Sequence, residues 1–301
     1  MTQAMTRMFP VCVVIAVVAG VADRLEAQRG AAPPAPARTP RAAAPIDLTG
    51  NWVSIVTQDW RFRMVTPAKG DYQGVQMTPA ARKVADSWDP ARDEAAGEQC
   101  KSYGAPALMA VPGRLRITWQ DDTTLKVDTD SGQQTRLLRF GAVPSSAAPP
   151  SAVPPGAVPP GAAPAAPLDS ARDKAVDAPR SWQGLSQAQW LTPRPAVPLQ
   201  LRPADRVAET PPIRPTGGSL RVVTTNLRAG YLRKNGVPYS ENAVVTEHWN
   251  LYKRPNGEEW LTITTQVDDP QFLTAARLTA PVFKKERDGS KWDPTPCSAR
   301  W

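Results

Sequence analysis

Histidine is almost absent from this sequence, because His248 is the single one in 301 residues. Metal sites built on histidine need several ligands close together, so we expect no metal ion and no cofactor held in this way. A Ser-His-Asp or Cys-His mechanism would have to use His248 itself. The sequence also lacks a Gly-rich phosphate loop, a G-x-S-x-G elbow and a C-x-x-C motif. We therefore assign no catalytic residue and expect a binding protein rather than an enzyme.

Long apolar runs are scarce as well. The longest covers residues 9–22, which at about 1.5 Å per residue is shorter than the ~30 Å hydrocarbon core of a membrane. A small-residue cleavage site follows at Leu25 to Ala27, so residues 1–27 are predicted to be a signal peptide. No second run of this kind follows, and we expect a periplasmic or secreted protein without a transmembrane segment after cleavage. An uncleaved membrane anchor is the alternative.

Cysteine occurs only three times, at Cys12, Cys100 and Cys297. Cys12 lies inside the predicted signal peptide, so the mature chain would keep two. Two cysteines in an oxidising compartment suggest a disulfide between Cys100 and Cys297. The alternative is a pair of free thiols.

Proline and glycine, in contrast, are abundant, with 34 and 19 residues. This density of helix breakers excludes a helical bundle, whereas ten tryptophans argue against a fully disordered chain. Residues 28–45 read as a disordered Pro/Ala-rich tether. Residues 46–301 are predicted to form one domain, interrupted by low-complexity, Pro-rich loops at about 143–179 and 192–215.

Between the Pro-rich tracts, apolar and polar residues alternate with the period of β-strands. Strands are expected at residues 51–56, 60–65, 114–119, 124–129, 135–140, 219–225, 244–252, 260–267 and 278–285. One short helix is expected from Pro79, with Thr78 as its cap and an end at Asp89-Pro90. The pattern predicts a mainly β chain, folded as an antiparallel barrel or sandwich of about 8–10 strands.

The formal net charge of +8 has two explanations. It can simply keep the protein soluble, or it can attract an anionic partner such as a component of the cell envelope. Nucleic acid is not expected for an exported protein. The paired carboxylates at 121–122, 258–259 and 268–269 lie at predicted turns, where solvation explains them. A hydrolase would instead need two carboxylates that converge across a cleft.

Several blocks resemble a family of exported bacterial β proteins of unestablished activity. They are DLTGNW at 47–52, C-x-x-x-G-x-P at 100–106, SWQGLSQAQW at 181–190, GGSLRVVTTNL at 217–227, NGVPYSENAVVTEHW at 235–249 and DDP at 268–270. The opening Gly50-x-Trp52 is also similar to the G-x-W signature of lipocalins. This resemblance implies a lipocalin-like β-barrel, in which a basic residue, here Lys284 or Arg277, packs on Trp52.

A barrel of this size can enclose one ligand. We therefore expect an exported protein that binds a small apolar or amphipathic molecule. The candidate binding residues are Trp52, Trp119, Trp249, Trp260 and Arg116. Ordinary core packing is the alternative role of each tryptophan, and the outer face of a sheet is that of the arginine. Two other functions remain open: an envelope module without a ligand cavity, and a carboxylate-dependent hydrolase.

Overall fold

The computed structural model describes residues 38–141, 179–192 and 217–300. The predicted signal peptide lies outside these residues, as do residues 28–37 of the tether and the two Pro-rich loops, apart from residues 179 and 192. The chain divides into two units, Met1–Arg38 and Thr39–Trp301, and the fold below is that of the second. Residues 39–45, assigned to the tether from sequence, form a turn in which the Arg41 N–H donates to the carbonyl of Asp122 (3.1 Å).

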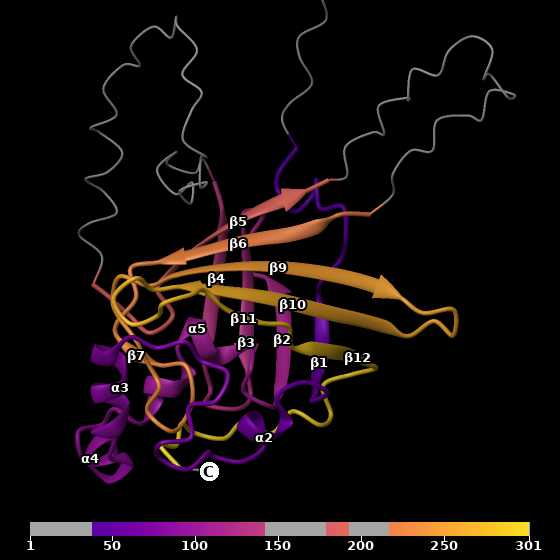
Figure 1. Ribbon diagram of the computed structural model, residues 1–301. Coiled ribbons are helices and arrows are strands. Elements are labelled where there is room, and N and C mark those ends of the chain that lie inside the picture. Colours follow the sequence, from indigo (N-terminus) through magenta and orange to yellow (C-terminus); the bar gives the residue numbers. More distant parts are fainter. Residues whose placement is uncertain (1–37, 142–178, 193–216, 301) are drawn as a thin grey trace, which may run out of the picture. The chain divides into compact units, whose positions relative to one another are not determined.

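The described residues form a closed β-barrel of nine strands, which confirms the mainly β barrel fold. In sheet order they are β10 (Glu259–Asp268), β12 (Val282–Glu286), β1 (Gly50–Ile55), β2 (Arg114–Trp119), β3 (Thr124–Thr129), β4 (Thr135–Phe140), β5 (Leu185–Leu191), β6 (Ser219–Thr225) and β9 (Val244–Lys253). Pairing of β9 with β10 closes the barrel (Figure 1).

The barrel is mixed rather than purely antiparallel, because β4 and β5 run parallel. Parallel neighbours need a crossover connection of a dozen residues or more. The chain between Phe140 and Leu185 is long enough for this. The other barrel pairs in the described residues are antiparallel.

Two predicted strands differ from the structure. Residues 60–65 contain the short helix α2 (Trp60–Arg63), because β1 already pairs with β2 and β12 and offers no free edge. Residues 278–285 are divided between β11 (Arg277–Thr279), which pairs with β10 beside the barrel, and β12. The break falls at Pro281, which has no N–H to donate to a strand ladder.

Helices in the described residues lie between β1 and β2, and they number more than the single helix expected. The predicted one is α3 (Pro79–Asp86), where the Thr78 hydroxyl accepts from the Ala81 N–H (3.2 Å). Asp89 does not end the helical region, because its carboxylate caps a second helix, α4 (Pro90–Ala95). The short helices η1 (Gln99–Tyr103) and α5 (Ala105–Leu108) follow. None of the helices in the described ranges has the length and apolar character needed to cross a lipid bilayer.

The barrel interior is filled by side chains of the described residues. The main core contains Leu48, Trp52, Tyr103, Leu108, Met109, Leu115, Ile117, Leu125, Val127, Leu138, Ala188, Leu220, Val222, Trp249, Leu261, Ile263 and Phe283. Leu108 and Met109 reach it from α5 and the residue after it, which places α5 against the barrel. A second core joins α3 to β8 (Pro238–Tyr239) and contains Val245 and Val267 from β9 and β10. Strand β7 (Gly230–Tyr231) pairs with β8.

A buried ion pair lies on the inner face of the barrel. The Arg136 guanidinium on β4 donates to both carboxylate oxygens of Glu247 on β9, at 3.0 and 2.7 Å. Both side chains are completely buried. The hydroxyl groups of Ser186 on β5 and Thr224 on β6 each accept a hydrogen bond from the Arg136 guanidinium. The two hydroxyl oxygens are also hydrogen-bonded to each other, at 2.8 Å. Four strands are thus joined by one polar network.

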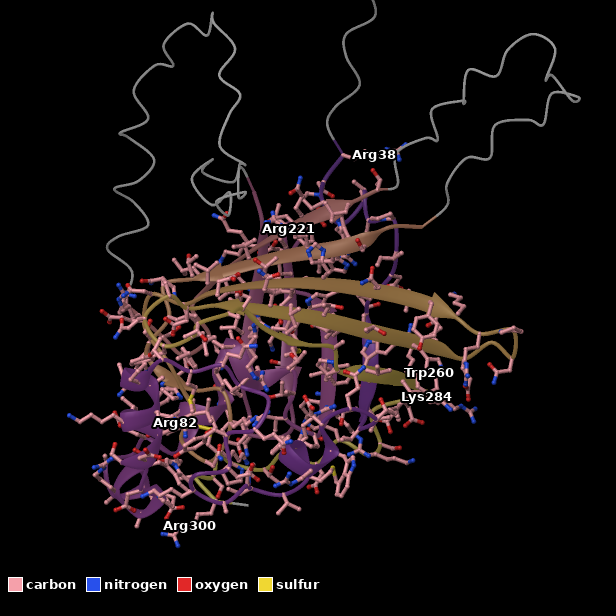
Figure 2. All side chains as sticks on the ribbon, in the orientation of Figure 1. Arg38, Arg82, Arg221, Trp260, Lys284 and Arg300 are labelled. Atoms are coloured by element: carbon pink, nitrogen blue, oxygen red, sulfur yellow. A yellow bond between two sulfur atoms is a disulfide. The ribbon has the colours of Figure 1, made fainter. Side chains whose placement is uncertain are left out.

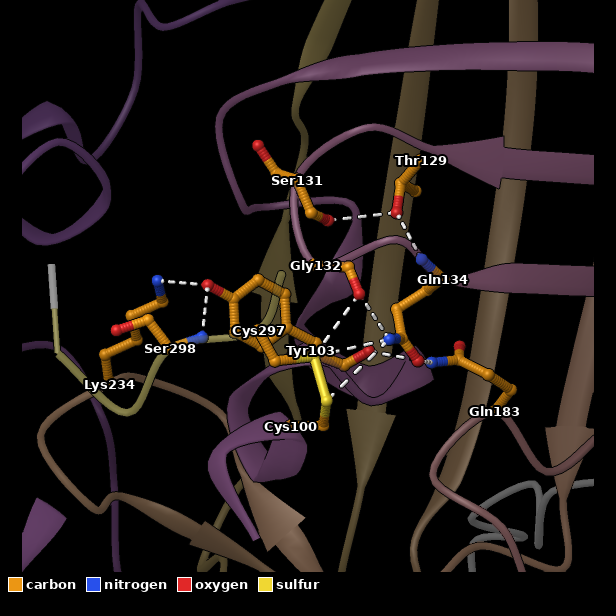
Figure 3. The surroundings of a disulfide bond; sticks show 10 residues. All are labelled: Cys100, Tyr103, Thr129, Ser131, Gly132, Gln134, Gln183, Lys234, Cys297 and Ser298. Carbon is orange, nitrogen blue, oxygen red and sulfur yellow. Dashed lines mark hydrogen bonds between the residues drawn. A yellow bond between two sulfur atoms is a disulfide. The ribbon is translucent and has the colours of Figure 1, made fainter. Parts of the chain in front are cut away.

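A disulfide between Cys100 and Cys297 joins η1 to the C-terminal segment, with 5.1 Å between the Cα atoms. The predicted pairing of these residues is supported by this geometry. Gln134 lies against the bridge, with its amide nitrogen 3.4 Å from the Cys297 sulfur, and also donates to the Gly132 carbonyl (Figure 3). The Gln183 amide donates to the carbonyl of Tyr103 and to the side-chain oxygen of Gln134. The bridge therefore lies in a network that connects four separate parts of the sequence.

Candidate functional site

The tryptophans predicted to bind a ligand do not gather around one cavity in the described part of the chain. Trp52 and Trp249 are both completely buried in the main core. Trp119 points inward at one end of the barrel, where its ring lies 5.5 Å from that of Phe140 and 6.5 Å from that of Trp190. These three rings are partly buried and pack against the main core. Trp119 also borders an open surface groove with Ile46 and Asp47.

Trp260 and Arg116 lie on the outer face of the barrel. Trp260 stacks on Tyr252 at 6.4 Å and has the Lys284 ammonium 5.9 Å from its ring, as the neighbouring labels in Figure 2 show. The Arg116 guanidinium covers the ring of Trp292 at 4.4 Å. Arg116 also borders a polar surface groove with Lys126. The position of Arg116 agrees with its alternative role on the outer face of a sheet, whereas Trp260 is not part of either hydrophobic core.

The G-x-W segment has a clear structural role. Gly50 has a φ of 125°, and a Cβ atom there would lie 2.9 Å from Cε of Lys285. Lys285 crosses the Trp52 ring at 5.3 Å, and the Trp52 indole N–H donates to the Leu48 carbonyl. The basic residue on Trp52 is therefore Lys285 and not Lys284 or Arg277, because Lys285 is the residue opposite Trp52 in the β1–β12 register.

A cationic pocket lies where α2, the α5–β2 connection, β11 and the turn after β7 meet. We call it the arginine pocket and define it by Arg63, Arg233 and Arg277, with Asp59 and Phe62 beside them. Its cavity volume is about 40 Å³, which is room for a group the size of a few water molecules. Lys234 also lines it, so four cations and one carboxylate face this small space.

Arg63 and Arg233 are nearly buried, with 7% of each residue exposed. Arg63 uses Nε to donate to the Ala110 carbonyl (2.7 Å), while one of its terminal nitrogens is buried without a partner. Arg233 donates to the Gln73 carbonyl (2.7 Å) and stacks on Phe62 at 4.0 Å, while its Nε has no partner. Burial lowers the pKa of both guanidinium groups. Each is therefore a pocket-lining residue that carries one unused donor.

Arg277 on β11 is the third arginine and is half-buried. Its backbone is paired with Val267 of β10, whereas its guanidinium group has no hydrogen-bond or ion-pair partner among the described residues. The pKa of Arg277 is lowered to about 10, mainly by burial and to a smaller extent by the positive charge of Arg233. Asp59 opposes these effects in all three arginines, but it does not lie within 4.0 Å of any of them. The pocket thus has an excess of positive charge without matched anions.

Lys234 is a different kind of cation in this pocket. Its ammonium donates to the phenol oxygen of Tyr103 (2.7 Å), and that oxygen also accepts from the Ser298 N–H at 3.4 Å. Burial lowers the pKa of Lys234 to about 8. Since Ser298 is the residue after Cys297, the disulfide-linked segment is positioned beside the pocket.

The carboxylate pairs do not converge on a cleft in the described residues. Glu258 and Glu259 are engaged by lysines of β9 and β12, and hydrogen bonding from Lys284 lowers the pKa of Glu258 to about 2. Asp121 accepts from Thr123, and Asp122 lies 3.9 Å from Arg41. Asp269 is an exception to the expected solvated turns, since it is buried and accepts from the backbone and hydroxyl of Ser240.

His248 lies on the outer face of β9, opposite Arg221 of β6. The pKa of His248 is lowered below 6.5, mainly by burial and to a smaller extent by the positive charge of Arg221. The folded state thus disfavours protonation, so the free energy of unfolding should fall as the pH is lowered from about 6.5 through the folded pKa. Because the chain has one histidine, proton NMR can follow this titration directly.

In the Arg221→Gln variant we expect the His248 midpoint to rise toward 6.5. Arg139→Gln is the matched control, because Arg139 is exposed on β4 and should leave the midpoint unchanged. A midpoint above 6.5 in the wild-type protein would contradict the expectation.

Known proteins give no further guide to this site. The sequence matches no model of a known protein family, and comparison with curated proteins and with solved structures gives no match. Within the described residues, no group of three or more His, Cys, Asp or Glu side chains is arranged to hold a metal ion. The resemblance to lipocalin-like exported proteins stays a prediction, and the function has to be inferred from geometry.

Proposed function

We propose that this chain is an exported β-barrel protein that binds a small molecule through an anionic group, held in the arginine pocket. The observation that carries the proposal is the pair of buried guanidinium nitrogens without partners, on Arg63 and Arg233, beside the unpaired Arg277. A buried donor that lacks a partner costs free energy. An oxyanion would satisfy these donors and neutralise the excess charge.

A carboxylate or phosphate group fits the chemistry and the size of the pocket. Guanidinium groups bind both anions through two parallel hydrogen bonds, which are stronger than those between neutral groups. The cavity of about 40 Å³ accepts such a group but not a whole drug-sized ligand. The rest of the ligand would extend outward past α2, where Phe62 offers an aromatic surface.

The proposed ligand site is at the end of the barrel rather than inside it. The interior is occupied by the main core, the ion pair of Arg136 and Glu247, and the three rings that include Trp119. An amphipathic ligand, as expected from sequence, remains compatible with this site, since only its anionic group would enter the pocket.

The test uses inorganic phosphate as the probe. Added phosphate should raise the unfolding midpoint of the wild-type protein, because a ligand that binds only the folded state stabilises it. Without phosphate, Arg277→Gln should be more stable than the wild type, because repulsion among the arginines of the pocket is relieved. Its free energy of unfolding should be higher by about 0.5–2 kcal/mol, and its unfolding midpoint should rise accordingly. The rise caused by phosphate should then be largely lost. Thermal unfolding at constant ionic strength measures both changes.

The matched control is Arg139→Gln, which removes the same charge from an exposed position on β4. It also corrects for the general stabilisation that phosphate gives to proteins. Acetate in place of phosphate then distinguishes a carboxylate site from a phosphate site. An equal response of Arg277→Gln and Arg139→Gln to both anions would refute an anion site in this pocket.

A further inference from the structure

An exposed apolar ridge lies directly beside the arginine pocket. It consists of Trp60, Met64 and Val65, which are 64%, 53% and 60% exposed. Six large hydrophobic side chains are exposed in the described residues, and this ridge supplies three of them within six consecutive positions. Such clustering marks an interaction surface more than scattered apolar residues do.

The ridge and the pocket share one short element, α2. Asp59, Phe62 and Arg63 line the pocket, whereas Trp60 and Met64 are spaced i and i+4 and therefore share a different, exposed face of the same turn. In Figure 1, α2 lies below β1 and β2 at the end of the barrel. A partner that meets this end would contact the apolar ridge and the arginine pocket together.

We propose that this end of the barrel docks on an anionic lipid surface, with a lipid phosphate in the arginine pocket and the ridge in the headgroup region. This inference rests on the proposed function, of which it names the ligand class. Charge complementarity selects this partner, because the pocket has excess positive charge and the chain has a net charge of +8.

The side chains of the ridge suit such a surface. Tryptophan is enriched where membrane meets water, because its ring is apolar and its indole N–H is polar. Stable attachment of a peripheral protein generally needs two signals, an apolar insertion and an electrostatic attraction to anionic headgroups. The ridge supplies the first and the pocket the second, and α2 contributes residues to both.

Vesicle co-sedimentation of the full chain tests this proposal. Vesicles that contain phosphatidylglycerol with phosphatidylcholine should bind the protein, and binding should weaken as salt is raised. Vesicles of phosphatidylcholine alone should bind it poorly. The double variant Trp60→Ala/Met64→Ala should lower the partition coefficient by about tenfold or more, because apolar area no longer enters the interface. Arg277→Gln should also lower it.

The control variant is Tyr252→Ala, which removes another exposed aromatic side chain, on β9, and should bind vesicles like the wild type. The stabilisation of the folded protein by inorganic phosphate should persist in the double variant, which shows that it is folded and that its pocket is intact.

The outcomes separate the two proposals. Stabilisation by phosphate without vesicle binding, or vesicle binding unaffected by the ridge substitutions, would overturn the docking proposal and leave the anion site in place. Vesicle binding that depends on Trp60 and Arg277, without any effect of phosphate, would support docking and overturn the small-molecule function. If the wild-type protein shows neither stabilisation by phosphate nor binding to vesicles, both proposals are overturned.

Discussion

Replacing Glu247 with leucine is expected to lower the free energy of unfolding by about 3–5 kcal/mol. The carboxylate is completely buried and accepts hydrogen bonds from both terminal nitrogens of Arg136. Its removal would leave a guanidinium inside the barrel with only the hydroxyls of Ser186 and Thr224 as partners. Those neutral groups cannot compensate a charge that has no access to water. Urea unfolding followed by tryptophan fluorescence measures the loss.

The matched variant is Arg136→Met/Glu247→Leu, which replaces both charges by apolar side chains. Most of the lost stability should return, because the cost of the single variant comes from the unpaired charge and not from the missing attraction. A double variant as unstable as Glu247→Leu would show that the interior needs the polar network for its packing. A single variant with wild-type stability would contradict the burial of this pair.

Removing the disulfide is expected to cost about 4–5 kcal/mol in the chain-entropy estimate for a long loop. Cys100 and Cys297 are separated by 197 residues, so the bridge restricts the unfolded chain strongly. In the folded protein few backbone bonds hold the C-terminal segment; Thr295 provides two, with Asp130 and Gly132. Cys100→Ser/Cys297→Ser should therefore unfold at a lower urea concentration and show early cleavage of residues near Ser298 by protease.

Reduction gives an independent measurement of the same bond. A reductant should lower the unfolding midpoint of the wild type to that of the double variant and leave the variant itself unchanged. Equal midpoints of reduced and oxidised wild type would mean that the bridge does not constrain the unfolded chain.

The sequence predicts a barrel strand well where its inner face carries large apolar residues. Strands β2, β3, β4 and β6 have the predicted bounds, because alternation such as Leu115, Ile117 and Trp119 reports one buried face. Strand β5 escaped prediction because its inward residues include Ser186 and Ala188, which are small. Their small size leaves space for the guanidinium of Arg136, a requirement that comes from another strand. Local pattern cannot reveal such a requirement.

The arginine pocket was only partly accessible to sequence reasoning. Arg63 lies in the segment 60–65 that was predicted to be a strand. This segment contains the helix α2 instead, and the side chain of Arg63 lines the pocket. Arg233 and Arg277 come from segments that meet only in the folded chain. For Arg277 the sequence gives one indication, because it lies shortly before Pro281, which separates β11 from β12.

The position of β12 between β1 and β10 makes assembly of the barrel depend on residues 282–286. Strand β12 pairs with both β1 and β10, and Trp52 lies opposite Lys285. These contacts join residues that are far apart in sequence, which slows folding to times on the order of milliseconds to seconds. Until β12 is in place, β1 keeps an open edge that can pair with another chain. A newly made molecule therefore exposes the edge of β1 to other chains until β12 has been synthesised and has paired with it.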